Sequence, residues 1–217
     1  MKKRIALVAA AALFGSFFFV LPEGVSADIP TVPAAHAPRS LLDREILDKG
    51  VEAYRQGDYE KALPYFYESD RMGHMKAARY IGLCYENGQG LPQNYGEARK
   101  WYEKAAQKGD VTSMYRLGRM YEKGEGMPVD YAKAAYWYGK SADRTDFIGA
   151  PSYTALGYLY ENGKGVARDL AKAESLYATA DAAGYAPAHE ALTALLGKEP
   201  AVHTPREALI NSQSQIS

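Results

Sequence analysis

Apolar and polar residues follow each other along the middle of this chain with the spacing of amphipathic helices. In one segment the apolar residues Ala98, Trp101 and Tyr102 lie three and four positions apart, which places them on one face of a helix. The same spacing returns at Ala134, Trp137 and Tyr138 and again at Ala173, Leu176 and Tyr177. The pattern therefore predicts a series of equivalent helices, each with one buried face.

Each of these helices is preceded by a shorter apolar segment that contains a glycine. These glycines are Gly82, Gly118 and Gly157, and they are spaced 36 and then 39 residues apart. A tyrosine follows each glycine, and a Gly-x-Gly pair lies three residues beyond each tyrosine. A repeat of this length indicates an array of helix pairs in which every unit packs on its neighbours.

Polar residues and glycines mark where the second helix of each pair begins and ends. Short polar side chains precede the second helices, where they can accept free backbone N–H groups of the first turn. They are Asn94, Asp130 and Asp169. Gly109 and Gly184 follow two of these helices, because glycine adopts the left-handed conformation without steric cost. Thr145 replaces this glycine in the middle unit and three extra residues follow it, so we expect a looser or bent joint there.

Small residues recur inside the predicted helices and need a structural reason, since a glycine inside a helix costs about 1 kcal/mol relative to alanine. Gly82, Gly118 and Gly157 recur opposite Ala98, Ala134 and Ala173. We expect the paired helices to approach each other closely at these positions. Tyr102, Tyr138 and Tyr177 then fill the space toward the neighbouring unit. All of these residues are interpreted as structural repeat positions.

The two ends of the chain differ in composition from its middle. Residues 1–27 combine a basic head, an apolar stretch and small residues at Val25-Ser26-Ala27, which predicts an export signal cleaved after Ala27. We expect a Pro/Ala-rich linker over 28–40 and a flexible tail over 198–217. Between them we expect a unit at 41–75, glycine repeats at 76–110, 111–149 and 150–185, and a capping helix at 186–197.

Charge and cysteine content exclude several classes of partner and fold. The chain has 26 Lys and Arg against 26 Asp and Glu, and no basic run lies outside the signal, so nothing favours nucleic acid or an anionic membrane. After signal cleavage we expect no membrane attachment and a periplasmic or secreted location. Cys84 is the single cysteine and cannot form a disulfide within the chain. Its position among core residues indicates a small buried hydrophobe.

The sequence resembles a known repeat family. The pattern Leu-Gly-x-x-Tyr, Gly-x-Gly, Asp-x-x-Lys-Ala and Trp-Tyr-x-x-Ala is similar to the Sel-one-like repeat, a relative of the tetratricopeptide repeat, and residues 117–142 match it nearly throughout. Residues 50–73 look more like a tetratricopeptide repeat. The resemblance implies an all-α, right-handed superhelix (solenoid) of helix pairs that serves as an adaptor in protein complexes.

No catalytic, metal or cofactor motif is complete. Gly139-Lys140-Ser141 resembles the end of a phosphate-binding loop, but Ala134 stands where the first glycine of that motif belongs. His189-Glu190 begins a zinc-protease pattern, but Thr193 replaces its second histidine. The Ser-x-x-Lys motif of serine β-lactamases does not occur. We therefore expect neither enzymatic activity nor a metal ion or cofactor.

The side chains that vary between repeats are candidates for partner contact. On the first helices they lie three positions before and one position after the shared glycine, and in a superhelix these positions should face the concave side. They are Arg79, Leu83, Tyr115, Arg119, Thr154 and Tyr158. Glu86, Glu122 and Glu161 recur one residue after the shared tyrosine, which favours a structural role, although a row of carboxylates also suits a basic segment of a partner.

The pattern as a whole favours an exported, non-enzymatic interaction module that binds a protein or peptide in the groove of the solenoid. The partner is expected in the cell envelope, while a host or rival-cell protein remains open. The alternative is a protein that binds or hydrolyses cell-wall fragments or β-lactams. This alternative rests on the family resemblance alone. The cysteine-rich members that are linked to such activity carry paired cysteines in every repeat, whereas this chain has only Cys84.

Overall fold

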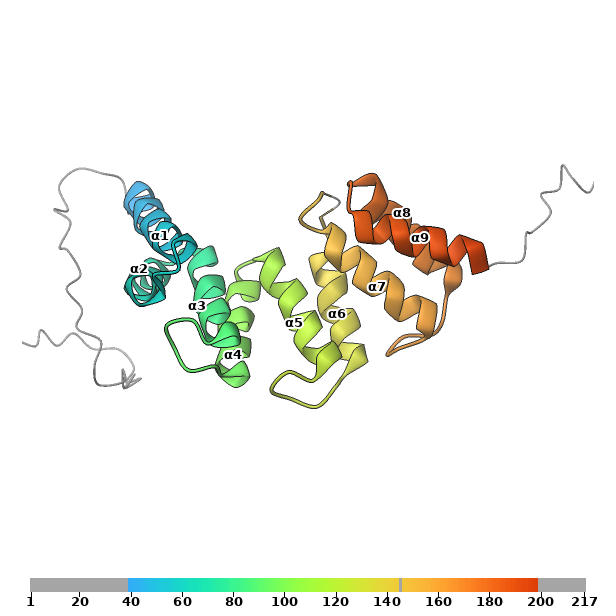
Figure 1. Ribbon diagram of the computed structural model, residues 1–217, viewed down its shortest axis with the longest axis horizontal. Helices are drawn as coiled ribbons and strands as arrows, with labels where there is room; N and C mark the ends of the chain where they lie inside the picture. Colours follow the sequence, from blue (N-terminus) through green and yellow to red (C-terminus); the bar gives the residue numbers. More distant parts are fainter. Residues whose placement is uncertain (1–38, 145, 199–217) are drawn as a thin grey trace, which may run out of the picture. The chain divides into compact units, whose positions relative to one another are not determined.

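The computed structural model describes residues 39–144 and 146–198, which form nine α-helices and no strand (Figure 1). The helices are α1 (Arg39–Arg55), α2 (Tyr59–Arg71), α3 (Met75–Asn87), α4 (Tyr95–Gln107), α5 (Val111–Lys123), α6 (Tyr131–Ser141), α7 (Ala150–Asn162), α8 (Leu170–Ala182) and α9 (Ala186–Lys198). The predicted all-α class is confirmed. The predicted signal and nearly all of the linker and tail lie outside the described residues.

Each helix packs against the helices next to it in the chain. The most extensive contacts are within the pairs α1–α2, α3–α4, α5–α6 and α7–α8, and less extensive contacts join each pair to the next. α9 packs mainly on α8 and continues the array by a single helix. This succession of helix pairs is a solenoid, in which contacts are local in sequence. No described helix has the length and apolar character needed to cross a membrane.

The helix ends follow from residues that the sequence analysis singled out. The side chains of Asn94, Asp130 and Asp169 each accept the backbone N–H three residues further on, at the starts of α4, α6 and α8. Gly109 and Gly184 follow α4 and α8 with φ of 89° and 82°. These caps confirm the predicted boundaries of the second helices.

The glycines inside the first helices make room for a tyrosine ring. A Cβ added at Gly82, Gly118 or Gly157 would lie 2.6, 2.5 or 2.7 Å from a ring carbon of the tyrosine twenty positions later in the same unit. These rings belong to Tyr102, Tyr138 and Tyr177, and all three are buried. We expected the close approach at Ala98, Ala134 and Ala173. Those alanines are fully buried, but the contact that only glycine permits is with the tyrosine.

The second glycine of each Gly-x-Gly loop joins its unit to the unit before it. A Cβ on Gly90 would meet Tyr59 at 3.0 Å, and one on Gly126 would meet Tyr95 at 2.6 Å. Tyr59 and Tyr95 begin the second helices of the preceding units. The predicted turn geometry is present, with φ above 70° at both glycines, and the loop glycine is also a packing residue.

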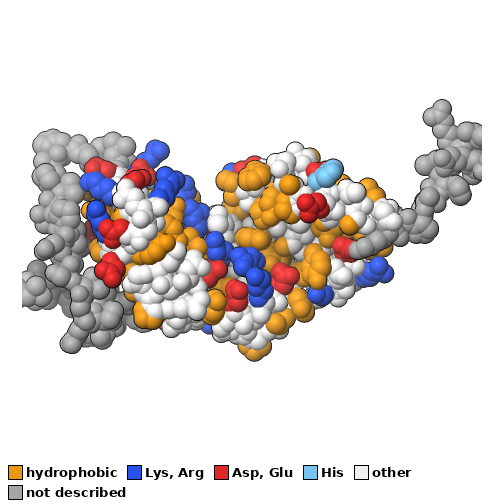
Figure 2. Space-filling view, viewed as in Figure 1, with side chains coloured by type: hydrophobic (Ala, Val, Ile, Leu, Met, Phe, Trp, Pro, Cys, Tyr) orange, Lys and Arg blue, Asp and Glu red, His pale blue; other side chains and the backbone are white. Residues whose placement is uncertain are grey.

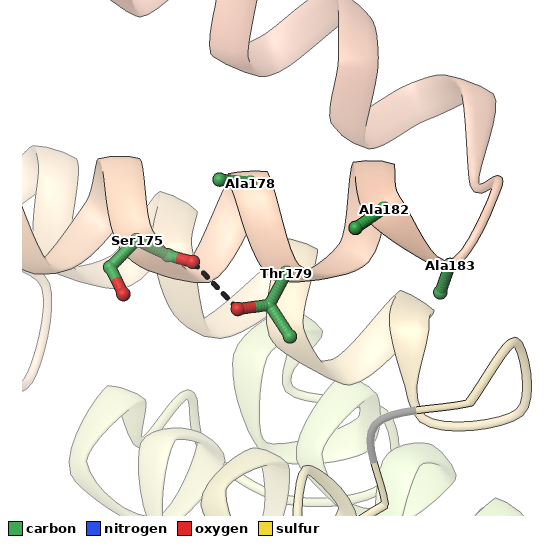
Figure 3. Close-up of a pocket in the computed structure, with 5 residues that line it drawn as sticks. All are labelled: Ser175, Ala178, Thr179, Ala182 and Ala183. Carbon is green, nitrogen blue, oxygen red and sulfur yellow. Dashed lines mark hydrogen bonds between the residues drawn. The ribbon is translucent and has the colours of Figure 1, made fainter.

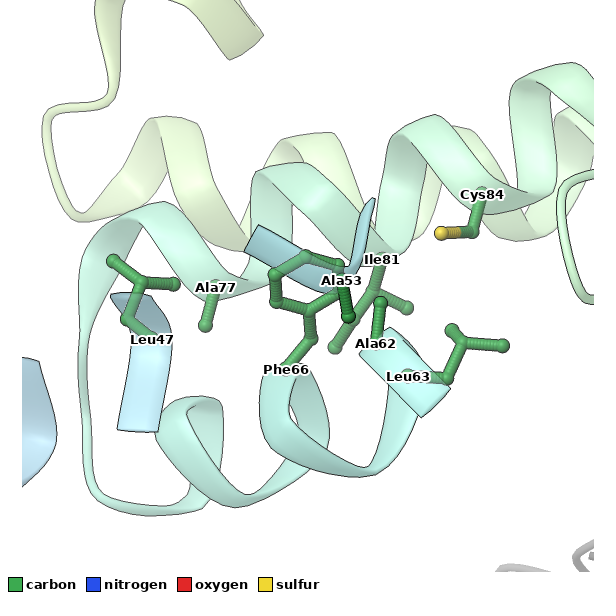
Figure 4. Packing of buried hydrophobic residues seen from close by; sticks show 8 residues of the cluster. All are labelled: Leu47, Ala53, Ala62, Leu63, Phe66, Ala77, Ile81 and Cys84. Carbon is green, nitrogen blue, oxygen red and sulfur yellow. The ribbon is translucent and has the colours of Figure 1, made fainter. Parts of the chain in front are cut away.

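The core is continuous from unit to unit because each cluster of buried residues joins helices of neighbouring units. Figure 4 shows the first cluster, in which Leu47 of α1, Phe66 of α2 and Ile81 of α3 meet. Cys84 lies in the same cluster, is fully buried, and burial raises the pKa of its thiol to about 12. The interpretation of Cys84 as a buried hydrophobe is confirmed.

The connection between α6 and α7 differs from the other connections between units. The side chain of Asp146 accepts the backbone N–H groups of Ile148 and Gly149, at 3.1 and 3.2 Å, and so forms a turn just before α7. No side chain caps α7 itself. Thr145, on which the expected looseness of this joint partly rested, lies outside the described residues, and that expectation stays a prediction.

Candidate interaction surface

The recurring glutamates of the first helices bind the recurring tyrosines of the second helices. The hydroxyl of Tyr102 donates to Glu86, that of Tyr138 to Glu122 at 2.5 Å, and that of Tyr177 to Glu161 at 2.8 Å. Burial, and then these carboxylates, hold the pKa of the three tyrosines far above its ordinary value. The three glutamates therefore have the structural role that their recurrence favoured.

Glu86 has a second partner, a cation from the next unit. The guanidinium of Arg116, on α5, donates to both carboxylate oxygens of Glu86, at 2.9 and 3.0 Å. The side chains of Arg116 and Glu86 are only 25% and 11% exposed, so this is a largely buried bridge from α5 to α3. In the next unit Ala155 stands at the position of Arg116, so α7 offers no equivalent cation there.

Arg79, a predicted partner-contact residue, is engaged within the chain. Its guanidinium donates to Asp110 at 3.0 Å, and the two side chains are 17% and 4% exposed. Asp110 is the N-cap of α5 and also accepts the backbone N–H of Ser113 at 2.8 Å. Arg79 thus fastens α3 to the start of α5, and a role for it in partner contact stays untested.

The two other predicted residues three positions before the shared glycine are also held by neighbours. Tyr115 is half-buried, and the centroid of its ring lies 5.8 Å from that of Tyr138. The hydroxyl of Thr154 donates to the carbonyl of Ala150 at 3.0 Å, one turn earlier in α7. These side chains contribute to packing and helix structure, so little of either side chain is accessible to a partner.

The residues one position after the shared glycine are more available. Leu83 is half-buried against the cluster around Tyr102. Arg119 is partly exposed, and within the described part of the chain it has no ion pair or hydrogen bond. Tyr158 is 39% exposed, and its hydroxyl accepts a hydrogen bond from Lys164 at 2.8 Å. We take Leu83, Arg119 and Tyr158 as the candidate interaction row.

Two adjacent apolar residues in one connection are exposed and were not among the predicted sites. Phe147 and Ile148, in the connection between α6 and α7, are 61% and 52% exposed. The ring of Phe147 meets Tyr185 edge to face at a centroid distance of 6.1 Å. The signal in the sequence was the step of 39 residues in place of 36. That step predicts a looser or bent joint, but it does not show which of the added side chains are exposed.

Two depressions on the described surface are lined by residues outside this row. The larger one, of about 510 Å³, lies along α8 and is lined by Ser175, Ala178, Thr179, Ala182 and Ala183 (Figure 3). A second, of about 270 Å³, lies where Gly90 meets the start of α2. Among the described residues no group of three or more His, Cys, Asp or Glu is placed to hold a metal ion.

Comparison with known proteins places this geometry in a family. The Sel1 repeat family matches residues 76–110, 111–146 and 150–185. The structure is similar to that of c5321, a protective antigen of uropathogenic Escherichia coli with an SLR fold, at a TM-score of 0.65 and 30% identity, over 77% of this chain and 36% of that one. It is also similar to a Sel1 repeat protein from Oxalobacter formigenes, at a TM-score of 0.63 and 30% identity, over 67% of this chain and 59% of that one.

Curated relatives match over a shorter stretch. The DAP3-binding cell death enhancer 1 proteins of Rattus norvegicus and Mus musculus are 39% identical over 49 residues, which is 23% of this chain and 10% of each relative. The chain thus spans a small part of these relatives, and the similarity is that of a repeat.

Proposed function

Since this chain is a Sel1-repeat protein, built from three such repeats with a further helix pair before them and a helix after them, we propose that it is an exported adaptor without enzymatic activity. It binds a protein or peptide of the cell envelope through the candidate interaction row. Residues 1–27 support the export step, because their basic head, apolar stretch and small residues are typical of a cleaved signal.

The observation that carries this proposal is the difference between two sets of positions on the first helices. The positions that recur in every repeat, the glycines and glutamates, are used to hold each unit together. The positions that vary place Leu83, Arg119 and Tyr158 in equivalent places on α3, α5 and α7, with part of each side chain accessible. Arginine and aromatic residues are frequent among the strong contributors to protein–protein contacts.

An enzymatic alternative finds no support in these side chains. Ser141 and Ser152 share a hydrogen bond of 2.6 Å, but both are fully buried, and Cys84 is buried with its pKa raised. A nucleophile needs an accessible side chain with an adjacent base. We therefore do not propose binding or hydrolysis of cell-wall fragments or β-lactams.

Affinity capture from an envelope extract, followed by mass spectrometry, tests the proposal. We compare the wild-type protein with the double variant Arg119→Ala, Tyr158→Ala and with a control variant, Lys61→Ala, Leu196→Ala, in which an exposed cation of α2 and an exposed apolar residue of α9 are removed. Arg79 is left unchanged, because its loss would leave Asp110 buried without its ion pair.

The proposal predicts that wild type and control capture the same envelope protein and that the double variant loses it, while thermal melting of all three is unchanged. Equal capture by all three variants, or no specific capture by wild type, contradicts it.

A further inference from the structure

The connection between α6 and α7 adds residues that the solenoid does not need. Residues 147–149 lie between the second and third matched repeats and belong to neither. Packing explains why residue 149 is a glycine, because a Cβ there would collide with the backbone of Arg144. Phe147 and Ile148 are each more than half exposed, although the ring of Phe147 meets that of Tyr185. Large apolar side chains held in solvent beside one another are typical of a contact surface.

This exposed pair is connected to the candidate interaction row through two tyrosines. Phe147 touches the ring of Tyr185. Tyr185 and Arg119 both act electrostatically on the hydroxyl of Tyr115, whose pKa is raised chiefly by burial. Figure 2 shows Lys and Arg side chains, with some Asp and Glu beside them, over α5, and hydrophobic side chains over the connection between α6 and α7, on the same face of the described part of the chain. A cationic and an apolar area therefore adjoin.

Arg119 is the arginine of α5 that forms no ion pair within the described part of the chain. Arg79 is paired with Asp110 and Arg116 with Glu86, whereas the described residues offer Arg119 no carboxylate. A guanidinium forms short, charge-assisted hydrogen bonds with a carboxylate, often through two parallel N–H groups. Beside the half-buried ring of Tyr115 such a pair is partly shielded from water, which strengthens it.

The acidic residues of the same helices do not favour a basic partner. Glu86, Glu122 and Glu161 each hold a tyrosine hydroxyl, and Glu86 also holds Arg116. Their carboxylates are therefore already engaged within the repeat. Arg119 is a cation of α5 that no carboxylate of the described residues engages.

We propose that Arg119, Phe147 and Ile148 determine the specificity of this surface, and that they take an extended peptide segment of a partner protein with a carboxylate side chain and, a few residues away, a large apolar side chain. The carboxylate binds Arg119 and the apolar side chain packs on Phe147 and Ile148. This inference rests on the proposed function, because it names the chemistry of the partner that the adaptor binds.

A library of random dodecamer peptides displayed on phage, selected against the purified protein, provides the probe. Enriched sequences are expected to combine Asp or Glu with a large apolar residue. Fluorescein-labelled synthetic copies are then titrated by anisotropy with four variants. Arg119→Gln and Phe147→Ser should each weaken binding by about tenfold or more, as the loss of a charge-assisted hydrogen bond or of one buried ring requires. Lys61→Gln and Leu196→Ser, also exposed, should leave affinity within about twofold.

A charge exchange isolates the contact at Arg119. Arg119→Glu should abolish binding of the acidic peptide and restore binding of the same peptide with its Asp or Glu replaced by Lys. Such reciprocal rescue reports the contact between residue 119 and the charged side chain of the peptide. A substitution that only disturbed the fold would not restore binding of the Lys peptide.

Several outcomes overturn the inference. The inference is wrong if no peptide is enriched or if the enriched peptides contain no acidic residue. It is also wrong if Arg119→Gln and Phe147→Ser leave the affinity unchanged. If Tyr158→Ala, titrated as a fifth variant, lowers the affinity while Arg119→Gln and Phe147→Ser do not, the proposed function is retained and this specificity is refuted. Enriched sequences that match residues 199–217 of this chain, or a dimer in sedimentation that Arg119→Glu dissociates, would assign the surface to the chain itself and contradict a partner peptide.

Discussion

The joint between α4 and α5 and the joint between α6 and α7 connect equivalent units, but they are fastened differently. At the first, Arg79 reaches the N-cap Asp110, and Arg116 reaches back to Glu86. At the second, Tyr115 stands at the position of Arg79 and Ala155 at that of Arg116. Asp146, at the position of Asp110, binds Arg144 and the backbone of its own turn.

The difference shows how a repeat separates structure from function. The contacts of the recurring glycine, tyrosine and glutamate hold every unit in the same way. The side chains that differ between repeats either form ion pairs across one joint or, where no such contact is available, remain accessible to solvent. At the second joint Arg119, Phe147 and Ile148 are accessible in this sense. Variation between repeats is therefore where a partner is expected to bind.

The largest effect should come from removing the fastening of the first joint. Asp110→Ala leaves Arg79 largely buried without its counter-ion and removes the cap of α5, so the free energy of unfolding should fall by about 3–5 kcal/mol. Asp146→Ala, at the second joint, should lower it by about 1 kcal/mol. Urea unfolding followed by circular dichroism measures both. Equal losses would mean that the two joints are fastened alike.

The contacts within the units should be equally strong on both sides of the second joint. Gly118→Leu and Gly157→Leu both force a side chain onto a buried tyrosine ring and should each lower the free energy of unfolding by about 1–3 kcal/mol or more. Gly139→Ala is the control, because a Cβ there meets nothing within 4 Å, and alanine should stabilise α6 by up to about 1 kcal/mol. A melting temperature of Gly118→Leu equal to wild type would refute the glycine–tyrosine contact.

A smaller difference is expected between two recurring glutamates. Glu86→Gln removes the negative charge opposite the largely buried Arg116 and should cost about 1.5–3 kcal/mol. Glu122→Gln affects the bond from Tyr138 and should cost about 0.5–1.5 kcal/mol. Thermal melting of the two variants compares them. A greater loss at Glu122 would contradict the view that Arg116 strengthens only the first joint.

The smallest effect is a pH dependence at His74, which caps α3. Its ring accepts the backbone N–H of Lys76, and burial, followed by repulsion from Lys76 and Lys108, lowers its pKa despite the attraction of Asp43 and Asp48. Because the folded chain favours the neutral ring, this contribution to stability is present above the ordinary pKa of about 6.5 and is lost as pH falls through the lowered pKa. Between pH 7.5 and pH 5 the melting temperature of the wild type should therefore fall more than that of His74→Asn. An equal loss would show that His74 does not contribute.

The repeat period, the caps and the buried tyrosines were predictable because they depend on spacing along one chain. Asn94, Asp130 and Asp169 cap the helices that the sequence assigned to them, and Tyr102, Tyr138 and Tyr177 are buried as expected. The engagement of Arg79 was not predictable, because its partner Asp110 was recognisable only as a neighbour of the second-helix boundary. The exposure of Phe147 and Ile148 depends on how an added turn folds, for which the repeat pattern provides no template.

Hydrogen–deuterium exchange of the protein with and without an enriched dodecamer peptide tests most directly whether the partner binds where the repeat varies. Peptide binding should slow exchange in α5 and in the segment Asp146 to Ala150, and should leave α2 and the exposed face of α8 unchanged. Slower exchange confined to α8, or to any part of the described chain other than α5 and the connection between α6 and α7, would contradict the account.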